Sequence, residues 1–304
     1  MSKSTEEIAD EMMRRTGIMY GLGYAEYERL AGLRKSNLWT FFRKTAAHYK
    51  ADLTEPHEET KPMKLGSATH CIVWEPSEFE KRYMVAPPPP DDRHGGRWNR
   101  VFKEHKAAWA EVVNNAALAG QEILEQEQYD RARFMRDKLH AHPQASALIK
   151  AFKPEVSMQW VDPETGLLIK ARLDGLEEQA LVLGDLKSCT DAHPFAFGRE
   201  AYKRGYHFQM SLYYDGLALL AKQAGKKHKP AAPVLIAVES AKPFEVACYQ
   251  LSESDLALGR AQYKEVLSGV KRCTETGRWP GYDTGLLSLM LPEHAGRELL
   301  AMEV

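Results

Sequence analysis

Two apolar segments with charges at fixed positions, residues 167–174 and 181–188, constrain the fold of this chain most strongly. Each has the length and composition of a β-strand, and a short polar stretch separates them, so they predict neighbouring strands. The first segment ends at Asp174. The second places Asp185 and Lys187 two positions apart, and therefore on the same face of a strand.

A hairpin centred between Glu178 and Gln179 would put Asp174 opposite residue 183, diagonally across from Asp185 on one sheet face. Two carboxylates so placed repel each other unless a cation neutralises them, and a hard divalent cation with oxygen ligands does this well. Mg²⁺ keeps several waters, one of which can become a nucleophile, and an adjacent lysine can position that water and stabilise phosphate charge. The spacing therefore predicts a centre for metal-assisted phosphodiester hydrolysis.

The alternative is structural. Asp174 would end a strand at a turn, and Asp185 and Lys187 would form a solvated pair on an edge strand. Leu183 and Leu186 on either side of Asp185 favour a central strand, where a charge usually has a purpose.

The rest of the chain predicts one α/β domain with a mixed central sheet and a helical N-terminal half. Ser36 is expected to cap a helix in the first 50 residues, and Ser252 a long one near the end. A proline-rich stretch, residues 86–97, is expected to be an exposed loop. The expected helices cover 65–74, 101–118, 121–140, 194–204, 207–222 and 252–276, and further strands begin near 155 and cover 234–239 and 245–251.

Composition excludes several classes of protein. The chain has 41 basic and 42 acidic residues and a net charge of -1, which excludes a histone-like basic coat but allows a local basic patch. Its four cysteines include no C-x-x-C pair, so we expect reduced thiols rather than a zinc site or iron–sulfur cluster. The N-terminus lacks an apolar signal segment, and no apolar run approaches the length of a membrane span. A soluble, cytoplasmic protein is expected.

The pattern Asp174…Asp185-Leu186-Lys187 resembles the PD-(D/E)xK nuclease core, and the wider sequence resembles RecE, the exonuclease VIII family of phage and prophage recombination. The resemblance covers roughly residues 20–285. Four further pieces match the family in its order: LGSATH at 65–70 with WEP at 74–76, WVDPETG at 160–166, YHFQMSLY at 206–213 and WP at 279–280.

The resemblance implies a restriction-endonuclease-like core, a mixed central β-sheet flanked by helices. It implies domain limits of 65–285, with a helical N-terminal extension over 1–64 and a C-terminal tail over 286–304. By the same likeness, Mg²⁺ (Mn²⁺ can substitute) is held by His70, Asp174, Asp185 and the backbone carbonyl of Leu186, and Lys187 is the catalytic lysine. Gln209 and Tyr213 share a helix face that is expected to look onto the scissile strand. Glu155 is a candidate ligand for a second metal, although glutamates are common at strand starts.

The implied activity is that of a Mg²⁺-dependent 5′→3′ exodeoxyribonuclease. It would degrade one strand of linear double-stranded DNA and leave 3′ single-stranded tails for recombination. The family further implies a toroidal homo-oligomer, a tetramer, and a single-strand annealing protein of the RecT type as partner, in a bacterial host that expresses a phage or prophage protein. Two alternatives stay open: another nuclease of the superfamily, RecB-like, CRISPR-associated or structure-specific, and a catalytically silent module that binds DNA ends.

Two basic groups are candidates for contacts with the DNA backbone, because phosphates need such partners. One is a helical group of Arg199, Lys203 and Arg204, and the other is a loop group of Lys226, Lys227 and Lys229. The alternative for both groups is an ordinary solvated surface.

Overall fold

A computed structural model describes residues 16–54, 60–91, 93, 95–96, 98–99, 101–282, 285–286 and 288–289. Its centre is a six-stranded mixed sheet in the order β1-β4-β5-β6-β7-β8. Strands β6 and β7 are parallel, and the other neighbours are antiparallel. The strands are β1 (Gly17–Met19), β4 (Lys153–Val161), β5 (Leu168–Glu177), β6 (Val182–Cys189), β7 (Val234–Glu239) and β8 (Val246–Gln250). The charged strand β6 is therefore central, as expected.

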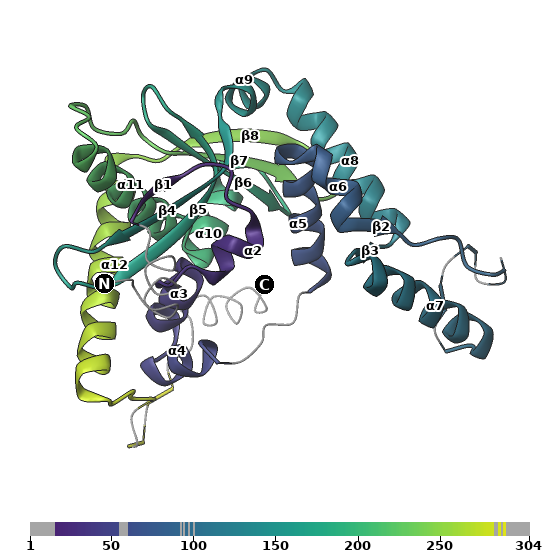
Figure 1. The fold of residues 1–304 in the computed structure, drawn as a ribbon, viewed down its shortest axis with the longest axis horizontal. Helices are drawn as coiled ribbons and strands as arrows, with labels where there is room; N and C mark the ends of the chain where they lie inside the picture. The colour runs from purple at the N-terminus through teal and green to yellow at the C-terminus, as the bar shows by residue number, and fades with distance from the viewer. Residues whose placement is uncertain are drawn as a thin grey trace, which may run out of the picture.

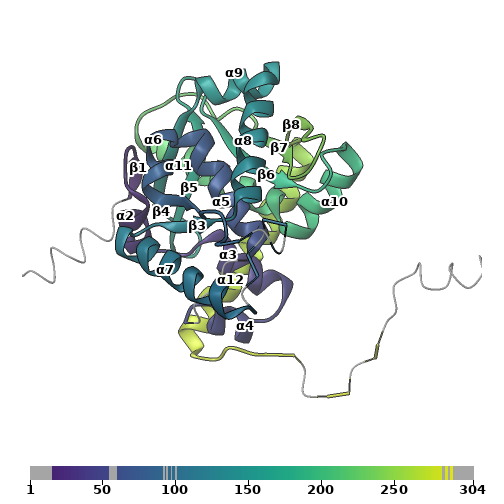
Figure 2. The same ribbon diagram turned by 90° about the vertical axis from the view of Figure 1, so that its right-hand side faces the viewer.

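Helices cover both faces of this sheet (Figure 1). One face carries α3 (Lys35–Arg43), α4 (Ala46–Asp52), α10 (Pro194–Arg204), α11 (Tyr206–Gln223) and α12 (Glu253–Thr276). The other face carries α5 (Lys61–Trp74), α6 (Pro76–Arg82), α8 (Gln126–Ala141) and α9 (Pro143–Ala151). Figures 1 and 2 both place α9 at one end of the molecule and α4 at the other. Each face thus has its own apolar core, and the sheet separates the two.

A smaller unit projects from the second face. Strands β2 (Tyr83–Val85) and β3 (Glu122–Leu124) pair in parallel, and α7 (Lys103–Ala119) connects them through the proline-rich segment. Figure 1 shows α7 standing away from the sheet. The prediction of a helix from residue 121 was wrong at its start. Residues 122–124 form β3, and α8 begins only after Glu125, whose side chain and that of Gln128 form a capping box.

Helix starts are where the sequence predictions erred most. Helix α5 begins at Lys61, four residues before the predicted start, because Thr60 caps it by accepting a hydrogen bond from the Met63 amide at 3.4 Å. Ser36 is not a cap, since α3 begins at Lys35 after Arg34. The capping box at Ser252 is confirmed.

The N-terminal part was predicted to form short helices, and α3 and α4 agree with this, but a strand that was not predicted precedes them. Residues 17–19 form β1, which pairs with β4, and α2 (Tyr24–Arg29) follows it. The domain boundary at residue 64 stays a prediction, and most of residues 286–304 lies outside the described residues. The four cysteines are free thiols, as expected. Within the described part of the chain, no helix combines the length and the apolar character needed to span a membrane.

The β5–β6 hairpin has a different register from the predicted one. Gly175 pairs with Gly184 and Glu177 with Val182, which centres the turn between Gln179 and Ala180. The Glu177 carboxylate fixes this turn by accepting hydrogen bonds from the amides of Gln179 (2.9 Å) and Ala180 (2.7 Å). The predicted register was off by two residues. A shift of two residues leaves each side chain on the sheet face that was predicted for it, because side chains alternate between the faces with a period of two.

Candidate metal centre

The centre is built around a kink in β4. Val156 pairs with Leu173 and Pro154 with Gly175, so Glu155 and Asp174 lie across from each other between these pairs. Glu155 has a φ of 55°, a left-handed conformation that costs a non-glycine residue about 1–2 kcal/mol. The two carboxylates meet there with His70 of α5, and one ligand atom from each of the three residues lies within 4.8 Å of the others.

His70 is oriented by the strand that it faces. Its Nε2 lies 2.8 Å from the Leu186 carbonyl oxygen, and a carbonyl only accepts, so Nε2 carries a proton. Burial, and secondly the Lys187 ammonium, lower the pKa of His70 and favour the neutral ring. The lone pair then sits on Nδ1, which lies 3.4 Å from Asp174 Oδ2. A histidine that donates its other N–H to a backbone carbonyl is the usual arrangement of a metal ligand.

Both carboxyl groups of the cluster are held where charge is costly. Burial raises the pKa of Asp174, and the nearby Asp185 carboxylate raises it further. Burial and then Asp174 raise the pKa of Glu155, against the opposing effect of Arg172. One imidazole nitrogen and two carboxylates make a donor set that fits Mg²⁺ or Mn²⁺, and a divalent cation would remove the repulsion.

Asp185 stands beside this cluster with partners of its own. Its Oδ2 lies 2.5 Å from Lys187 Nζ, and its Oδ1 accepts a hydrogen bond from Gln209 Nε2 at 2.5 Å. Burial opposes the charge on Lys187, but the Asp185 and Asp174 carboxylates together raise its pKa above the ordinary value, so this lysine is an ammonium. The structure thus gathers His70, Asp174 and Glu155, and keeps Asp185 with Lys187.

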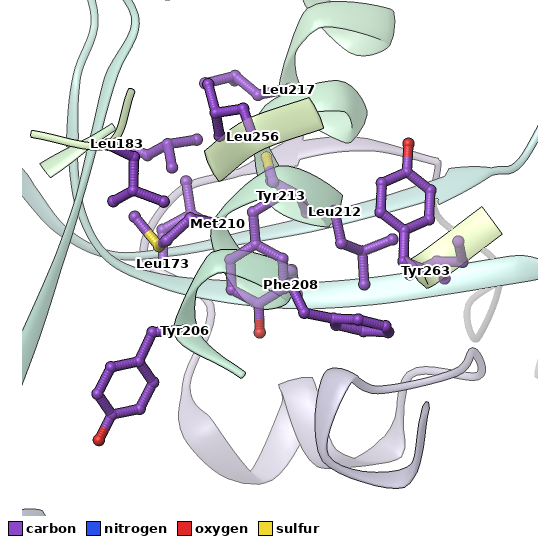
Figure 3. Close-up of a cluster of buried hydrophobic side chains, with 14 of the residues drawn as sticks. Leu173, Leu183, Tyr206, Phe208, Met210, Leu212, Tyr213, Leu217, Leu256 and Tyr263 are labelled. Carbon is purple, nitrogen blue, oxygen red and sulfur yellow. The ribbon is translucent and has the colours of Figure 1, made fainter. Parts of the chain in front are cut away.

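Three further residues were predicted to belong to the centre, and they differ in how they contact it. Gln209 reaches the centre through Asp185, whereas Tyr213, one turn further along α11, is buried in an apolar cluster with Leu173 and Phe208 (Figure 3). The Leu186 carbonyl accepts the His70 hydrogen bond, and its role as a direct ligand stays a prediction.

Two residues near the centre were missed by the sequence reasoning. Arg172 donates to the Glu155 carboxylate and is itself fixed by the Leu22 carbonyl at 2.7 Å. Lys35 donates to the Arg204 carbonyl at 2.7 Å, and burial, followed by Lys187, lowers its pKa to about 7. Lys35 lies in no motif and reaches the centre only through the tertiary fold. Arg172 precedes Asp174 by two positions on the predicted strand, so strand alternation could have placed it on the same sheet face.

A cleft of about 660 Å³ opens on this centre. His70, Lys187 and Tyr206 line it, with Lys187 Nζ 4.9 Å from the centre of the Tyr206 ring. Of the predicted helical DNA-binding group, Arg204 lines the cleft, while Arg199 and Lys203 are exposed on α10 and are not among its lining residues. The predicted loop group Lys226, Lys227 and Lys229 lies elsewhere, at the other end of α11.

Comparison with known proteins supports the fold. A solved structure from Eubacterium rectale, described as "Putative exonuclease", matches with a TM-score of 0.56 at 10% identity over 97% of this chain and 98% of that chain. A second structure, of the protein SSO0001, has a TM-score of 0.26 at 12% identity over 76% of this chain and 85% of that one, and carries no argument. No curated protein sequence matches the chain.

The family comparison extends over most of the sequence. A family profile described as "PDDEXK-like domain of unknown function (DUF3799)" matches residues 36–287. The predicted fold class, a mixed sheet flanked by helices in the PD-(D/E)xK manner, is confirmed. The chain therefore belongs to the DUF3799 family of PDDEXK-like domains.

Proposed function

We propose that the protein is a divalent-metal-dependent nuclease that hydrolyses the phosphodiester bonds of DNA. The observation that carries this proposal is the meeting of His70, Glu155 and Asp174 within 4.8 Å, next to the Asp185–Lys187 pair. The PDDEXK-like family and the likeness to a structure described as an exonuclease support it.

The residues divide the chemistry among them. Mg²⁺, or Mn²⁺ in its place, would supply a Lewis acid and an activated water when bound. His70, Glu155 and Asp174 would hold it through Nδ1 and the carboxylate oxygens. The Lys187 ammonium lies at the cleft, where it can bind a non-bridging phosphate oxygen and stabilise the charge that develops there. Gln209 holds Asp185 in place, and Asp185 in turn holds Lys187.

The finer proposal is a RecE-type 5′→3′ exodeoxyribonuclease. It would act on linear double-stranded DNA ends and leave 3′ tails, as a toroidal tetramer that works with an annealing protein of the RecT type in a phage or prophage system. The motifs at 65–76, 160–166, 206–213 and 279–280 support this part.

The test is the degradation of duplex DNA labelled on either the 5′ or the 3′ end, with and without Mg²⁺, beside a closed circular duplex. We expect Mg²⁺-dependent loss of the 5′ label from linear DNA only. Lys187→Met should lower the rate by about 10²–10³-fold, because one charge that stabilises the transition state is lost. Lys150→Met, a change to an exposed lysine on α9, serves as the matched control.

The other outcomes have defined meanings. Cleavage of the circular duplex would replace the exonuclease proposal with an endonuclease. Binding of duplex ends without any cleavage in Mg²⁺ or Mn²⁺ would identify a silent DNA-binding module. A wild-type rate in Lys187→Met would refute the proposed centre.

A further inference from the structure

A second basic surface lies at the C-terminal end of α11, away from the metal centre. An open hollow of about 820 Å³ is bounded there by α11, the start of α12 and the loop that leads to β7. We call it the distal basic hollow. Five of its basic lining residues are exposed, namely Lys222, Lys226, Lys227, His228 and Lys229, and a sixth, Arg260, is half-buried.

Acidic groups in the lining do not cancel this charge. Asp215 receives two hydrogen bonds of 2.6 Å from the Arg260 guanidinium and one of 2.5 Å from the Tyr263 hydroxyl. Its charge is therefore already compensated. Glu253 is the other carboxylate of the lining, which also contains four lysines. The distal basic hollow has a net positive charge suited to an anionic ligand.

The loop that carries the lysines is held in place by neighbouring elements. The Tyr214 hydroxyl donates to the Pro230 carbonyl at 2.9 Å, and the Ala231 amide donates to the Ala180 carbonyl at 3.0 Å. Lys226 Nζ donates to the Glu178 carbonyl at 2.9 Å. These bonds attach the loop to α11 and to the β5–β6 turn, so the lysines are presented from a fixed backbone.

The separation from the metal centre is set by α11 itself. Gln209, which touches Asp185, and Lys222, which lines the hollow, lie on the same helix. At 1.5 Å per residue, the backbone rise between them is about 20 Å. Successive phosphates of a DNA strand advance about 3.4 Å along the helix axis, so this distance corresponds to about six nucleotides. Figure 1 shows α11 and α5, which carries His70, on different sides of the sheet.

We propose that the distal basic hollow binds backbone phosphates of the DNA substrate about six nucleotides from the bond that is cut. The inference rests on the proposed nuclease function, because it is that function which places DNA in the cleft. The ligand is the phosphate backbone of DNA, bound by charge and without regard to sequence. An acidic protein partner is the competing occupant, and the test excludes it.

The test compares two charge-removing double variants in a binding assay without divalent cations. Lys227→Gln with Lys229→Gln removes two lysines of the hollow and leaves the Lys226 contact intact. Lys103→Gln with Lys106→Gln removes two exposed lysines of α7, as a control of equal charge. Fluorescence anisotropy with a duplex of about 30 base pairs measures the affinity at several salt concentrations between about 50 and 200 mM. The slope of log affinity against log salt reports the number of phosphate contacts, because each contact adds about 0.9 to its magnitude.

We expect the slope of log affinity against log salt to be shallower by about two in the hollow variant than in wild type. The ratio of wild-type affinity to variant affinity should therefore fall about tenfold from the lowest to the highest salt concentration. The α7 control should keep the wild-type slope. Equal slopes for wild type and the hollow variant would overturn the proposal, as would an equal change in the control. Turnover of a small chromogenic phosphodiester, which reaches only the metal centre, should stay at the wild-type rate in the hollow variant. Because the binding assay needs no catalysis, failure of the nuclease proposal would show separately, as absent cleavage by wild type.

Discussion

Asp174→Asn should stabilise the metal-free protein at alkaline pH. Burial and the neighbouring Asp185 raise the pKa of Asp174 to about 8 in the folded state, far above that of an unfolded aspartate. When the pKa of a carboxyl group is higher in the folded than in the unfolded state, the protein has its full stability at a pH below the unfolded-state pKa. That stability is lost as the pH rises through the folded-state pKa. The wild type should therefore lose stability between about pH 4 and pH 8. The asparagine variant, which has no charge to acquire, should not.

The magnitude follows from the size of the shift. Four pKa units at 1.36 kcal/mol each give a ceiling of about 5 kcal/mol. The Asp174 side chain is 16% exposed, so solvent screens part of this cost, and we expect a difference of about 2–5 kcal/mol. Asparagine keeps an oxygen that can accept the Leu186 amide hydrogen bond of 2.7 Å, so the packing is preserved.

Urea unfolding in EDTA at several pH values measures this effect as the difference in unfolding free energy between variant and wild type. A difference that stays constant within about 1 kcal/mol from acid to alkaline pH would refute the reasoning. A second measurement adds Mg²⁺ at alkaline pH. Ligand binding to the native state should then raise the midpoint of the wild type and leave that of Asp174→Asn unchanged.

Two further changes test the surroundings of the centre. Gly184→Ala would place a Cβ 2.2 Å from the Phe152 ring, so it should destabilise the protein by about 1–3 kcal/mol in urea unfolding, and Phe152→Leu in the same chain should restore part of the loss. Lys35, with a pKa of about 7, should lose its ammonium as the pH rises. DNA affinity in EDTA should therefore fall more steeply between about pH 6 and pH 8 in wild type than in Lys35→Met, where only the carboxyl groups of the centre still ionise. Parallel profiles would exclude a role for this lysine.

The strands of the centre could be predicted because their signals are local. Alternation and apolar length define β5 and β6, and the two-residue spacing puts Asp185 and Lys187 together in any register. The register itself was missed because the carboxylate of Glu177 positions the turn, and no strand pattern reports a side chain that binds turn amides.

The way in which the side chains of the centre come together could not be predicted from the sequence pattern. The left-handed backbone at Glu155 turns a strand residue toward His70, and propensity gives no sign of it at a glutamate. Arg172 and Lys35 act through contacts with segments far away in the chain, Leu22 and Arg204. The short strand β1 was not predicted either, because three residues are too few to show the alternation of a strand.

The placement of Gln209 on α11 has a consequence for how the protein is made. A ribosome adds about 5–20 residues per second, so His70 leaves it roughly 7–28 s before Gln209 does. During that interval the nascent chain already carries His70 and, later, Glu155 and Asp174, but α11 has not yet closed over Asp185. Strand β1 likewise waits for β4, its partner in the sheet. The centre is thus completed late in synthesis, when most of the domain that surrounds it is already available to fold.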